Sequence, residues 1–308
     1  MRAAGVRRFN GAVELLALPD PRPPRPDEVL IDVFAAGVGN WDDIARSGGW
    51  ELGVPPPLAL GVQAAGVVTA VGDEAREPQV GARVLTHSLP LREQGAWAEQ
   101  FIAAAEHLVV LPENVPFDVA AALPVPGLTA EQTLGVLDIR AGEQLLVHGA
   151  GGVTGSLLVR LGVLRGAEVI ATAGPRSTAR VRDLGAAVVL DHGEGHWVDR
   201  VHELSGGAGV PTAVNAAPSG ARYALRAVRD GGRLATITSD PPAAERDIAV
   251  HTVYVRPDGA MLGRLADLCG RGAIGVLLGR PYRLEQAPAA LARVLEGTGG
   301  RAIVLALG

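Results

Sequence analysis

The feature that most constrains the fold is an alternation of strand-like and helix-like segments that begins after about residue 117. The apolar run "QLLVHG" (144–149) precedes the helix-like "SLLVRLGVLRG" (156–166), and "EVIATAG" (168–174) precedes "STARVRDLGA" (177–186). Strands that alternate with helices of about 10–15 residues indicate right-handed βαβ units and a parallel sheet. We therefore predict a doubly wound α/β domain in this part of the chain.

The alternation continues toward the C-terminus. It predicts strands at 186–192, 211–217 and 233–239, with helices at 196–205 and 220–232 between them. For the last fifty residues it predicts a helix at 258–271, a strand at 274–278, a helix at 285–296 and a closing strand at 301–307.

The first hundred residues have a different pattern, which predicts strands and turns without intervening helices. Short valine-rich runs at 28–38, 64–72 and 82–87 are separated by glycine and proline at the spacing of strands and turns. We expect residues 1–117 and 258–308 to form a β-rich domain, and residues 118–257 to form the α/β domain.

Composition excludes several kinds of function. The formal net charge of −5 argues against nucleic acid or an anionic membrane as the main partner. No apolar run is long enough to span a membrane, and a single cysteine suits a reducing compartment, so we expect a cytoplasmic protein. All 28 residues in the combined Lys and Arg count are arginine, so the chain contains no lysine. This rules out a Schiff-base lysine and a Walker A lysine.

A glycine cluster follows the first strand of the α/β region. Ala150, Gly152 and Gly155 occupy the three small-residue positions of a dinucleotide fingerprint, and Val153 and Thr154 head the next helix. Small residues there let the backbone approach a pyrophosphate, whose charge then lies at the helix N-terminus. The alternative is a tight strand–helix turn without a ligand.

The second strand indicates which dinucleotide binds. An NAD site usually carries Asp or Glu about 20 residues beyond the glycines, but residues 171–180 contain no carboxylate. Arg176, Ser177 and Arg180 stand there instead. One charge-assisted bond to a 2′-phosphate would favour NADPH over NADH by roughly ten- to a hundredfold. The alternative is two solvated helix arginines.

The chain resembles the medium-chain dehydrogenase/reductases, and within them the zinc-independent quinone oxidoreductase or zeta-crystallin-like branch. The resemblance covers nearly the whole chain. Its motifs are "AAGVGNWDDIARSGG" (35–49), "LALGVQAAGVVTAVG" (58–72), "QGAWAEQ" (94–100), "LPVPGLTAEQTL" (123–134), "VHGAGGVTGSLLVRLG" (147–162), "LGAAVVLDH" (184–192), "VYVRPDGAMLGRLADL" (253–268) and "GGRAIVLALG" (299–308).

The resemblance implies a GroES-like catalytic domain joined to a Rossmann domain. It implies a homodimer through residues 247–256, with His251 and Tyr254 near the two-fold axis. It also implies a substrate cleft that includes Asn40, Trp41, Trp50, His87, Trp97 and Thr129, and further cofactor contacts from His192, Ala216, Thr238, Ser239 and Arg301.

Several of these assignments have a second interpretation from the residues alone. Trp41 and Trp50 are either aromatic walls for a flat substrate or ordinary packing residues. His87 is either a proton donor or a structural histidine after a strand. Asp42 is expected to fix the turn at the start of its helix, in a pair with Arg46, rather than to transfer a proton.

We predict no metal site. Zinc relatives need cysteine and histidine ligands, but Cys269 is the single cysteine, and Gly61-Val62-Gln63 replaces their ligand-bearing Gly-His-Glu. His192 and His196 are separated by glycines that disfavour a helix able to aim both rings at one ion.

The resulting hypothesis is an NADPH-dependent oxidoreductase that reduces quinones or α,β-unsaturated carbonyl compounds. Without a Lewis acid, such acceptors are easier substrates than alcohols, because the developing oxyanion needs only hydrogen-bond donors and a proton. Two alternatives remain: an enoyl reductase of a biosynthetic pathway, and a non-catalytic NADPH-binding protein. Fold alone cannot choose between them.

Overall fold

The computed structural model describes residues 1–308 and divides them into two compact units. One unit contains residues 1–128 and 256–308, and the other contains residues 129–255. Residues 118–128 and 256–257, which we expected in the α/β domain, thus lie in the first unit. For residues 118–128 the reason is that α2 (Phe117–Ala122) packs on the first unit's sheet, against β3 (Glu28–Val38) and β5 (Gln63–Val71).

The second unit is built on one sheet of six parallel strands, in the order β11-β10-β9-β12-β13-β14. This is the doubly wound order, with its reversal between β9 and β12. The doubly wound α/β domain predicted from the alternation, and the Rossmann domain that the resemblance implies, are confirmed. The strands are β9 (Gln144–His148), β10 (Glu168–Ala173), β11 (Val188–Asp191), β12 (Val210–Asn215), β13 (Val228–Thr236) and β14 (Ala249–Thr252).

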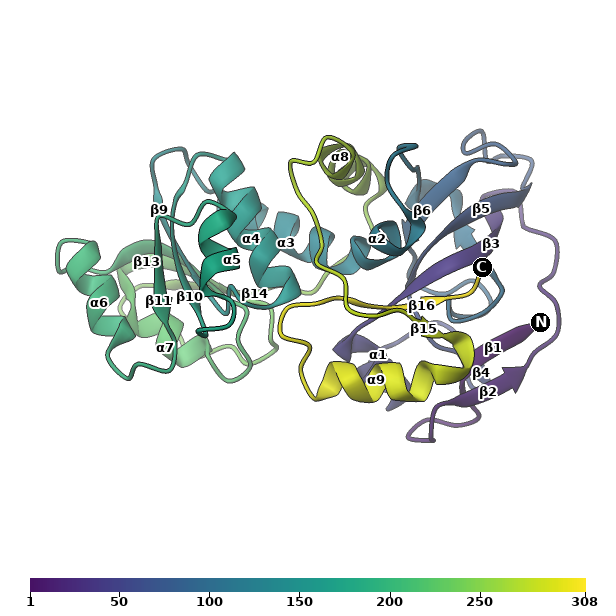
Figure 1. Ribbon diagram of the computed structural model, residues 1–308, viewed down its shortest axis with the longest axis horizontal. Coiled ribbons are helices and arrows are strands. Elements are labelled where there is room, and N and C mark those ends of the chain that lie inside the picture. The colour runs from purple at the N-terminus through teal and green to yellow at the C-terminus, as the bar shows by residue number, and fades with distance from the viewer. The chain divides into compact units, whose positions relative to one another are not determined.

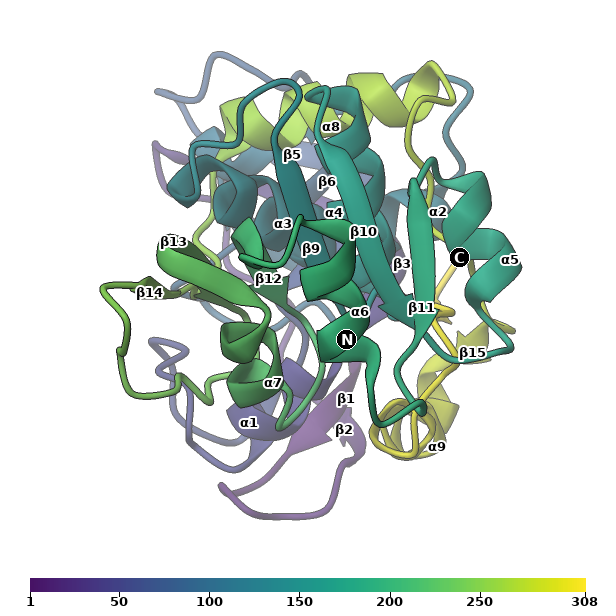
Figure 2. The ribbon, with the colours of Figure 1, turned by 90° about the vertical axis from the view of Figure 1, so that its left-hand side faces the viewer.

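Helices cover both faces of this sheet. Figures 1 and 2 show α4 (Val153–Leu164) and α5 (Thr178–Asp183) on one face, and α6 (Trp197–Leu204) and α7 (Ala221–Arg226) on the other. The central strands are largely apolar because both of their faces are covered. The helix predicted at 220–232 is too long, since the chain enters β13 at Val228.

The first unit is rich in antiparallel strands. A seven-stranded sheet has the order β15-β16-β3-β5-β6-β8, with β7 also paired to β3, and a smaller sheet has the order β2-β1-β4. The remaining strands are β1 (Arg2–Val6), β2 (Glu14–Ala17), β4 (Leu58–Ala59), β6 (Arg83–His87), β7 (Gln100–Ala104), β8 (Leu108–Val110), β15 (Tyr282–Arg283) and β16 (Ile303–Ala306).

Helices of the first unit are α1 (Asn40–Arg46), α2, α8 (Gly259–Gly270) and α9 (Ala287–Leu295), with 3₁₀ turns η1 (Ala105–His107) and η2 (Leu284–Gln286). The helix α3 (Pro124–Val136) contains the boundary between the units. No helix in the chain has the length and the apolar character that crossing a membrane requires.

One predicted strand is wrong. Residues 274–278 form only an isolated bridge, from Leu278 to Ala302. The amide of Ala273 donates to the carbonyl of Leu268 at 2.9 Å, and Ile274 is buried. The start of this apolar run therefore closes the C-terminus of α8 instead of extending a sheet.

Candidate functional site

The glycine turn between β9 and α4 admits only glycine at two positions. Gly149 has φ +90°, and a Cβ there would lie 2.8 Å from the backbone of Ala216. A Cβ on Gly155 would lie 2.2 Å from the carbonyl oxygen of Gly149. Gly155 therefore fulfils the close-packing role of a fingerprint glycine, and Gly149 is a further required glycine that the motif comparison missed.

The carbonyl groups of this turn are held by side chains of the protein. The Arg180 guanidinium donates to the carbonyl of Gly151 at 2.7 Å and to Ser156 Oγ at 2.5 Å. Ser156 Oγ lies 2.8 Å from the carbonyl oxygen of Gly152 and 3.1 Å from that of Ala150. Three successive carbonyls thus turn toward Ser156 and Arg180.

The amide groups at the start of α4 have no such partners. Gly152 is its N-cap, is exposed and has no capping side chain, so the first-turn amides of Val153 and Thr154 have no acceptor within the helix. Ala150, two residues before this N-cap, is fully buried. Inward carbonyls, outward amides and the positive end of the helix dipole suit a bound pyrophosphate.

The predicted 2′-phosphate residues follow β10. Arg176 is exposed, and Ser177 precedes α5 with its Oγ 3.1 Å from where a Cβ on Gly151 would lie. Arg180, by contrast, is engaged with the glycine turn. His192 is exposed just after β11, where its ring approaches Gly174.

A polar network at the ends of β12 and β13 was not predicted. Asn215 and Thr236 end these strands and are fully buried, while Thr238 and Asp240 follow β13. Asn215 Nδ2 donates to Thr238 Oγ1 at 2.8 Å, and Thr238 donates to Asp240 Oδ1. The available sequence signal was a polar residue at the end of each buried strand. Thr238 of this network is itself a predicted cofactor residue. Two further predicted residues lie nearby: Ala216, whose amide donates to the carbonyl of His148, and Ser239, which is exposed with φ +57°.

His148 ends β9 at the point where the strand order reverses. Its ring stacks on Trp197 with centroids 4.6 Å apart, and its Nδ1 lies 2.7 Å from Thr172 Oγ1. Burial, and then the nearby His192, lower the pKa of His148 to about 4. The ring is therefore neutral and structural at physiological pH.

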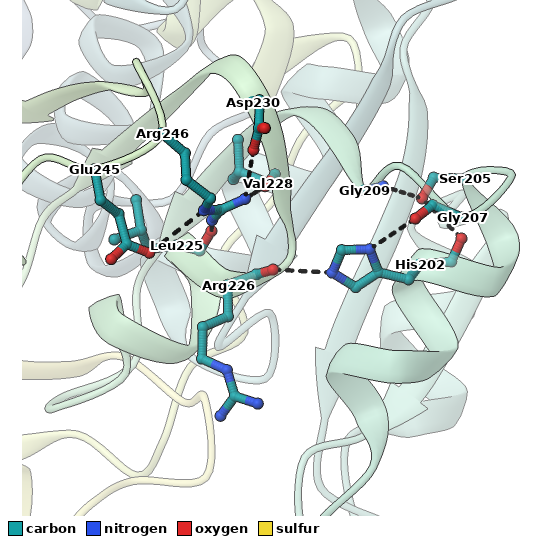
Figure 3. Close-up of polar contacts among 10 residues, drawn as sticks. All are labelled: His202, Ser205, Gly207, Gly209, Leu225, Arg226, Val228, Asp230, Glu245 and Arg246. Carbon is teal, nitrogen blue, oxygen red and sulfur yellow. Dashed lines mark hydrogen bonds and ion pairs between the residues drawn. The ribbon is translucent and has the colours of Figure 1, made fainter.

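The loop between β13 and β14 is anchored at its far end by Arg246 (Figure 3). The guanidinium donates to the carbonyl of Val228 at 2.7 Å and to that of Leu225 at 2.8 Å, and it pairs with Asp230 at 3.2 Å. Beside it, His202 Nε2 contacts the carbonyl of Arg226 at 2.9 Å. Residues 237–248 are thus held both at the Asn215 network and at the opposite end of β13.

The residues expected to line the substrate cleft are divided between the units. Asn40, Trp41, Trp50, His87 and Trp97 belong to the first unit, while Thr129 belongs to the second. Trp97 is fully buried, and its Nε1 donates to the carbonyl of Gly37 at 3.0 Å, so it is a packing residue. Asn40 is exposed at the start of α1, and Trp41 and Trp50 are half-buried. The predicted cofactor residue Arg301 is exposed in the first unit and donates to the carbonyl of Leu278 at 3.2 Å.

His87 is a buried, neutral imidazole. His87 is the last residue of β6. Its Nδ1 lies 3.0 Å from the carbonyl oxygen of Val62, and its Nε2 is buried without a hydrogen-bond partner. Burial lowers the pKa of His87 to about 4. Because the carbonyl requires a proton on Nδ1, the neutral ring presents an acceptor lone pair at Nε2.

Asp42 is fully buried in the first turn of α1. Its Oδ2 accepts from the amide of Gly39 at 2.8 Å, whereas Oδ1 has no hydrogen-bond partner. Burial raises the pKa of this carboxyl to about 8, against the lowering effect of the Gly39 and Gly61 amides. The expected pair with Arg46 is wrong, because Arg46 bonds to Asp43 at 2.7 Å on the outer side of the helix.

Val62 and Gln63, at the position of the Gly-His-Glu turn that carries ligands in zinc relatives, make packing and hydrogen-bond contacts in this chain. Val62 is buried, and Gln63 Oε1 accepts from the amide of Val125 at 2.7 Å. The Gln63 amide nitrogen lies so close to Gly37 that a Cβ there would be 1.9 Å away. These residues do not fit a zinc ion, and no three His, Cys, Asp or Glu side chains gather into a group that could hold a metal.

Comparison with known proteins agrees with this architecture. Residues 25–113 match the family described as alcohol dehydrogenase GroES-like domain, and residues 153–291 match the family described as zinc-binding dehydrogenase. Human quinone oxidoreductase is 31% identical over 99% of this chain and 98% of its own length.

Solved structures are similar over the whole chain. A crystal structure of an NAD-dependent alcohol dehydrogenase superposes with a TM-score of 0.90 at 26% identity, covering 100% of both chains. The CurK enoyl reductase superposes with a TM-score of 0.86 at 20% identity, covering 100% of this chain and 99% of its own, which shows a shared fold.

Proposed function

Because the chain belongs to the medium-chain dehydrogenase/reductase superfamily, whose members use a nicotinamide cofactor, we propose that it is a zinc-independent oxidoreductase reducing quinones or α,β-unsaturated carbonyl compounds with NADPH. The observation that carries the proposal is the glycine turn, in which Arg180 and Ser156 engage the carbonyls and leave the first-turn amides of α4 for an anion. The similarity to quinone oxidoreductases supports the acceptor class.

Dinucleotide binding involves residues at four strand ends. The turn after β9 would hold the pyrophosphate, and Arg176 and Ser177 after β10 would receive the adenosine ribose and its 2′-phosphate. On the other side of the reversal, Ala216 and Thr238 would receive the nicotinamide half. The bound cofactor supplies the hydride.

The donor set supports catalysis without zinc. Cys269 is the single cysteine, and it lies half-buried on α8. Val62 offers no ligand atom, and the Gln63 side chain is occupied by the backbone of Val125. His87 is neutral above its lowered pKa, so it is not a cationic acid at neutral pH. For a quinone or enone, hydrogen-bond donors and a proton delivered through water would serve the developing oxyanion.

We also propose that the chain forms a homodimer through residues 247–256 and works in the cytoplasm. β14 lies at the sheet edge, where one row of its backbone groups has no strand partner. Tyr254, just beyond it, is 67% exposed. A single cysteine agrees with a reducing compartment.

A two-step titration tests the proposal. Purified protein is titrated with NADPH and with NADH, and 1,4-benzoquinone or a simple enone is then added while dinucleotide absorbance is followed. Tight NADPH binding followed by oxidation supports the proposed reductase. Binding without turnover favours an enoyl reductase with a specialised substrate or a non-catalytic protein, and absence of binding removes the proposal. Elemental analysis should find no stoichiometric zinc; one zinc per chain contradicts the metal-free assignment.

A further inference from the structure

The polar network at the ends of β12 and β13 has a defined donor direction. Asn215 Oδ1 accepts from the amide of Ala217 at 3.2 Å, so Nδ2 must be the donor end of this side chain. Nδ2 donates to Thr238 Oγ1 at 2.8 Å and to Thr236 Oγ1 at 3.1 Å. Each threonine hydroxyl has a single proton. Because each hydroxyl oxygen accepts from Nδ2, its own proton remains available to donate one hydrogen bond to another acceptor.

Both hydroxyls donate to one carboxylate oxygen. Thr236 Oγ1 lies 3.2 Å from Asp240 Oδ1, and Thr238 Oγ1 donates to the same atom. Oδ2 of Asp240 receives no hydrogen bond from the protein, and no arginine or histidine forms an ion pair with this residue. Asp240 is therefore a held negative charge with one oxygen still available.

The fold places this charge on one half of the dinucleotide site. The glycine turn follows β9, and the adenosine side follows β10 and β11. The nicotinamide half must extend in the other direction, over the ends of β12 and β13. Asp240 follows β13, two strands from β9, which is about 10 Å at ordinary strand spacing.

The segment that carries Asp240 is fixed at both ends. The network holds it beside Thr236, and Arg246 holds the far end of the loop through the carbonyls of Leu225 and Val228 (Figure 3). A charge on a loop held in this way acts at one location instead of averaging over many.

We propose that Asp240 selects the redox state of the bound dinucleotide, favouring the oxidised form, whose nicotinamide ring carries a positive charge, over the reduced form, whose ring is neutral. This inference rests on the proposed nicotinamide-dependent function. The same carboxylate would stabilise positive charge that develops on the ring as hydride leaves, so it favours hydride donation over hydride uptake.

The test is a pair of dissociation constants, for NADP⁺ and for NADPH, measured by calorimetry on the full chain. In Asp240→Asn the ratio of NADP⁺ affinity to NADPH affinity should fall by about three- to tenfold, as expected for loss of one half-exposed charge. Asp240→Glu should retain most of the ratio.

Asp191→Asn is the matched control. Asp191 ends β11, which is also two strands from β9 but on the adenosine side, and its Oδ1 accepts from the amide of Gly193 at 2.8 Å. Its substitution should leave the ratio unchanged.

An unchanged ratio in Asp240→Asn, with both nucleotides still bound, overturns the inference and leaves the proposed function intact. If the wild-type protein binds neither nucleotide, the proposed function itself fails. Circular dichroism checks the fold of each variant, and Asp240→Ser replaces Asp240→Asn if the latter does not fold.

Discussion

Arg180 donates a hydrogen bond to the carbonyl oxygen of Gly151 across 2.7 Å, so the helix after the second strand is tied to the turn after the first. Side-chain contacts between neighbouring βα units thus shape the backbone that faces the ligand. The sequence indicated a 2′-phosphate contact for both Arg176 and Arg180 and did not predict this bond, which separates two arginines that sequence alone could not distinguish.

Substitution of each arginine should therefore have a different effect on nucleotide affinity. Arg176→Ala should weaken NADPH about ten- to a hundredfold and leave NADH nearly unchanged, because it removes a charge-assisted bond to the 2′-phosphate alone. Arg180→Ala should weaken both nucleotides, because the carbonyl of Gly151 loses its donor. Fluorescence titration with each nucleotide measures this, and an equal loss of NADPH and NADH in Arg176→Ala contradicts the phosphate assignment.

Two glycines of the turn provide a second pair of variants. Gly155→Ala should abolish dinucleotide binding and destabilise the fold by about 1–3 kcal/mol, because its methyl group would lie 2.2 Å from the carbonyl oxygen of Gly149. Gly152→Ala should fold normally, since the nearest atom to its Cβ is 3.6 Å away. Urea unfolding and NADPH titration separate these outcomes, and normal NADPH binding by Gly155→Ala would mean that the turn is not the phosphate cradle.

The buried carboxyl of Asp42 should make stability fall with rising pH. Its pKa is about 8 in the folded protein against 3.8 for the free group. The folded state retains a proton that the unfolded state releases, so the contribution is full below pH 3.8 and is lost as the pH rises toward 8. Relative to Asp42→Asn, the wild-type free energy of unfolding should fall by up to about 1.4 kcal/mol per pH unit between pH 5 and 7. A constant difference would show that the carboxyl is ionised in the folded protein.

His87 should have the opposite effect. Its pKa of about 4 in the folded protein, against 6.5 for the free group, means that the unfolded state takes up the proton first. The stability is present above pH 6.5 and is lost as the pH falls through 4. Urea unfolding at pH 7 and pH 5 should show the wild-type protein losing stability relative to His87→Asn, whose side-chain amide can still donate to Val62. Equal pH dependence of the two proteins would indicate that folding does not lower the pKa of the imidazole.

The proposed dimer can be tested with one tyrosine variant and a control variant on the same unit. Tyr254→Asp should convert a dimer into a monomer in sedimentation experiments, because the two-fold axis would bring two buried carboxylates close together. Tyr223→Asp changes another exposed tyrosine, on α7 instead of at the sheet edge, and should leave the assembly unchanged. A wild-type protein that sediments as a monomer removes the proposal.

Hydrophobic periodicity predicted most of the fold. The runs at 144–149 and 168–174 became β9 and β10, since a strand buried on both faces needs continuous apolar residues. The same criterion wrongly predicted a strand at 274–278, where an apolar run follows helix α8. Whether such a run pairs with a strand or covers a helix end depends on distant partners that local sequence does not contain.

The candidate site was predictable where function requires small residues. Gly155 follows from the need for close packing. The role of Arg176 stays a prediction, which rests on the missing carboxylate after β10. The Asp240 network and the protonated state of Asp42 depend on tertiary structure. They arise from which strand ends are adjacent and from how completely the fold buries a side chain.

The absence of lysine has a consequence for how the protein responds to alkali. Contacts through Arg180 at the glycine turn and Arg246 at the β13–β14 loop are made by guanidinium groups, which remain protonated wherever a protein is folded. Among the buried side chains described above, Asp42 is the one whose pKa, about 8, lies near physiological pH, whereas His87 and His148, with pKa values of about 4, stay neutral there. Raising the pH would therefore disturb the interior of the GroES-like unit at Asp42 while the dinucleotide turn kept its shape, so alkaline loss of activity would precede loss of nucleotide binding.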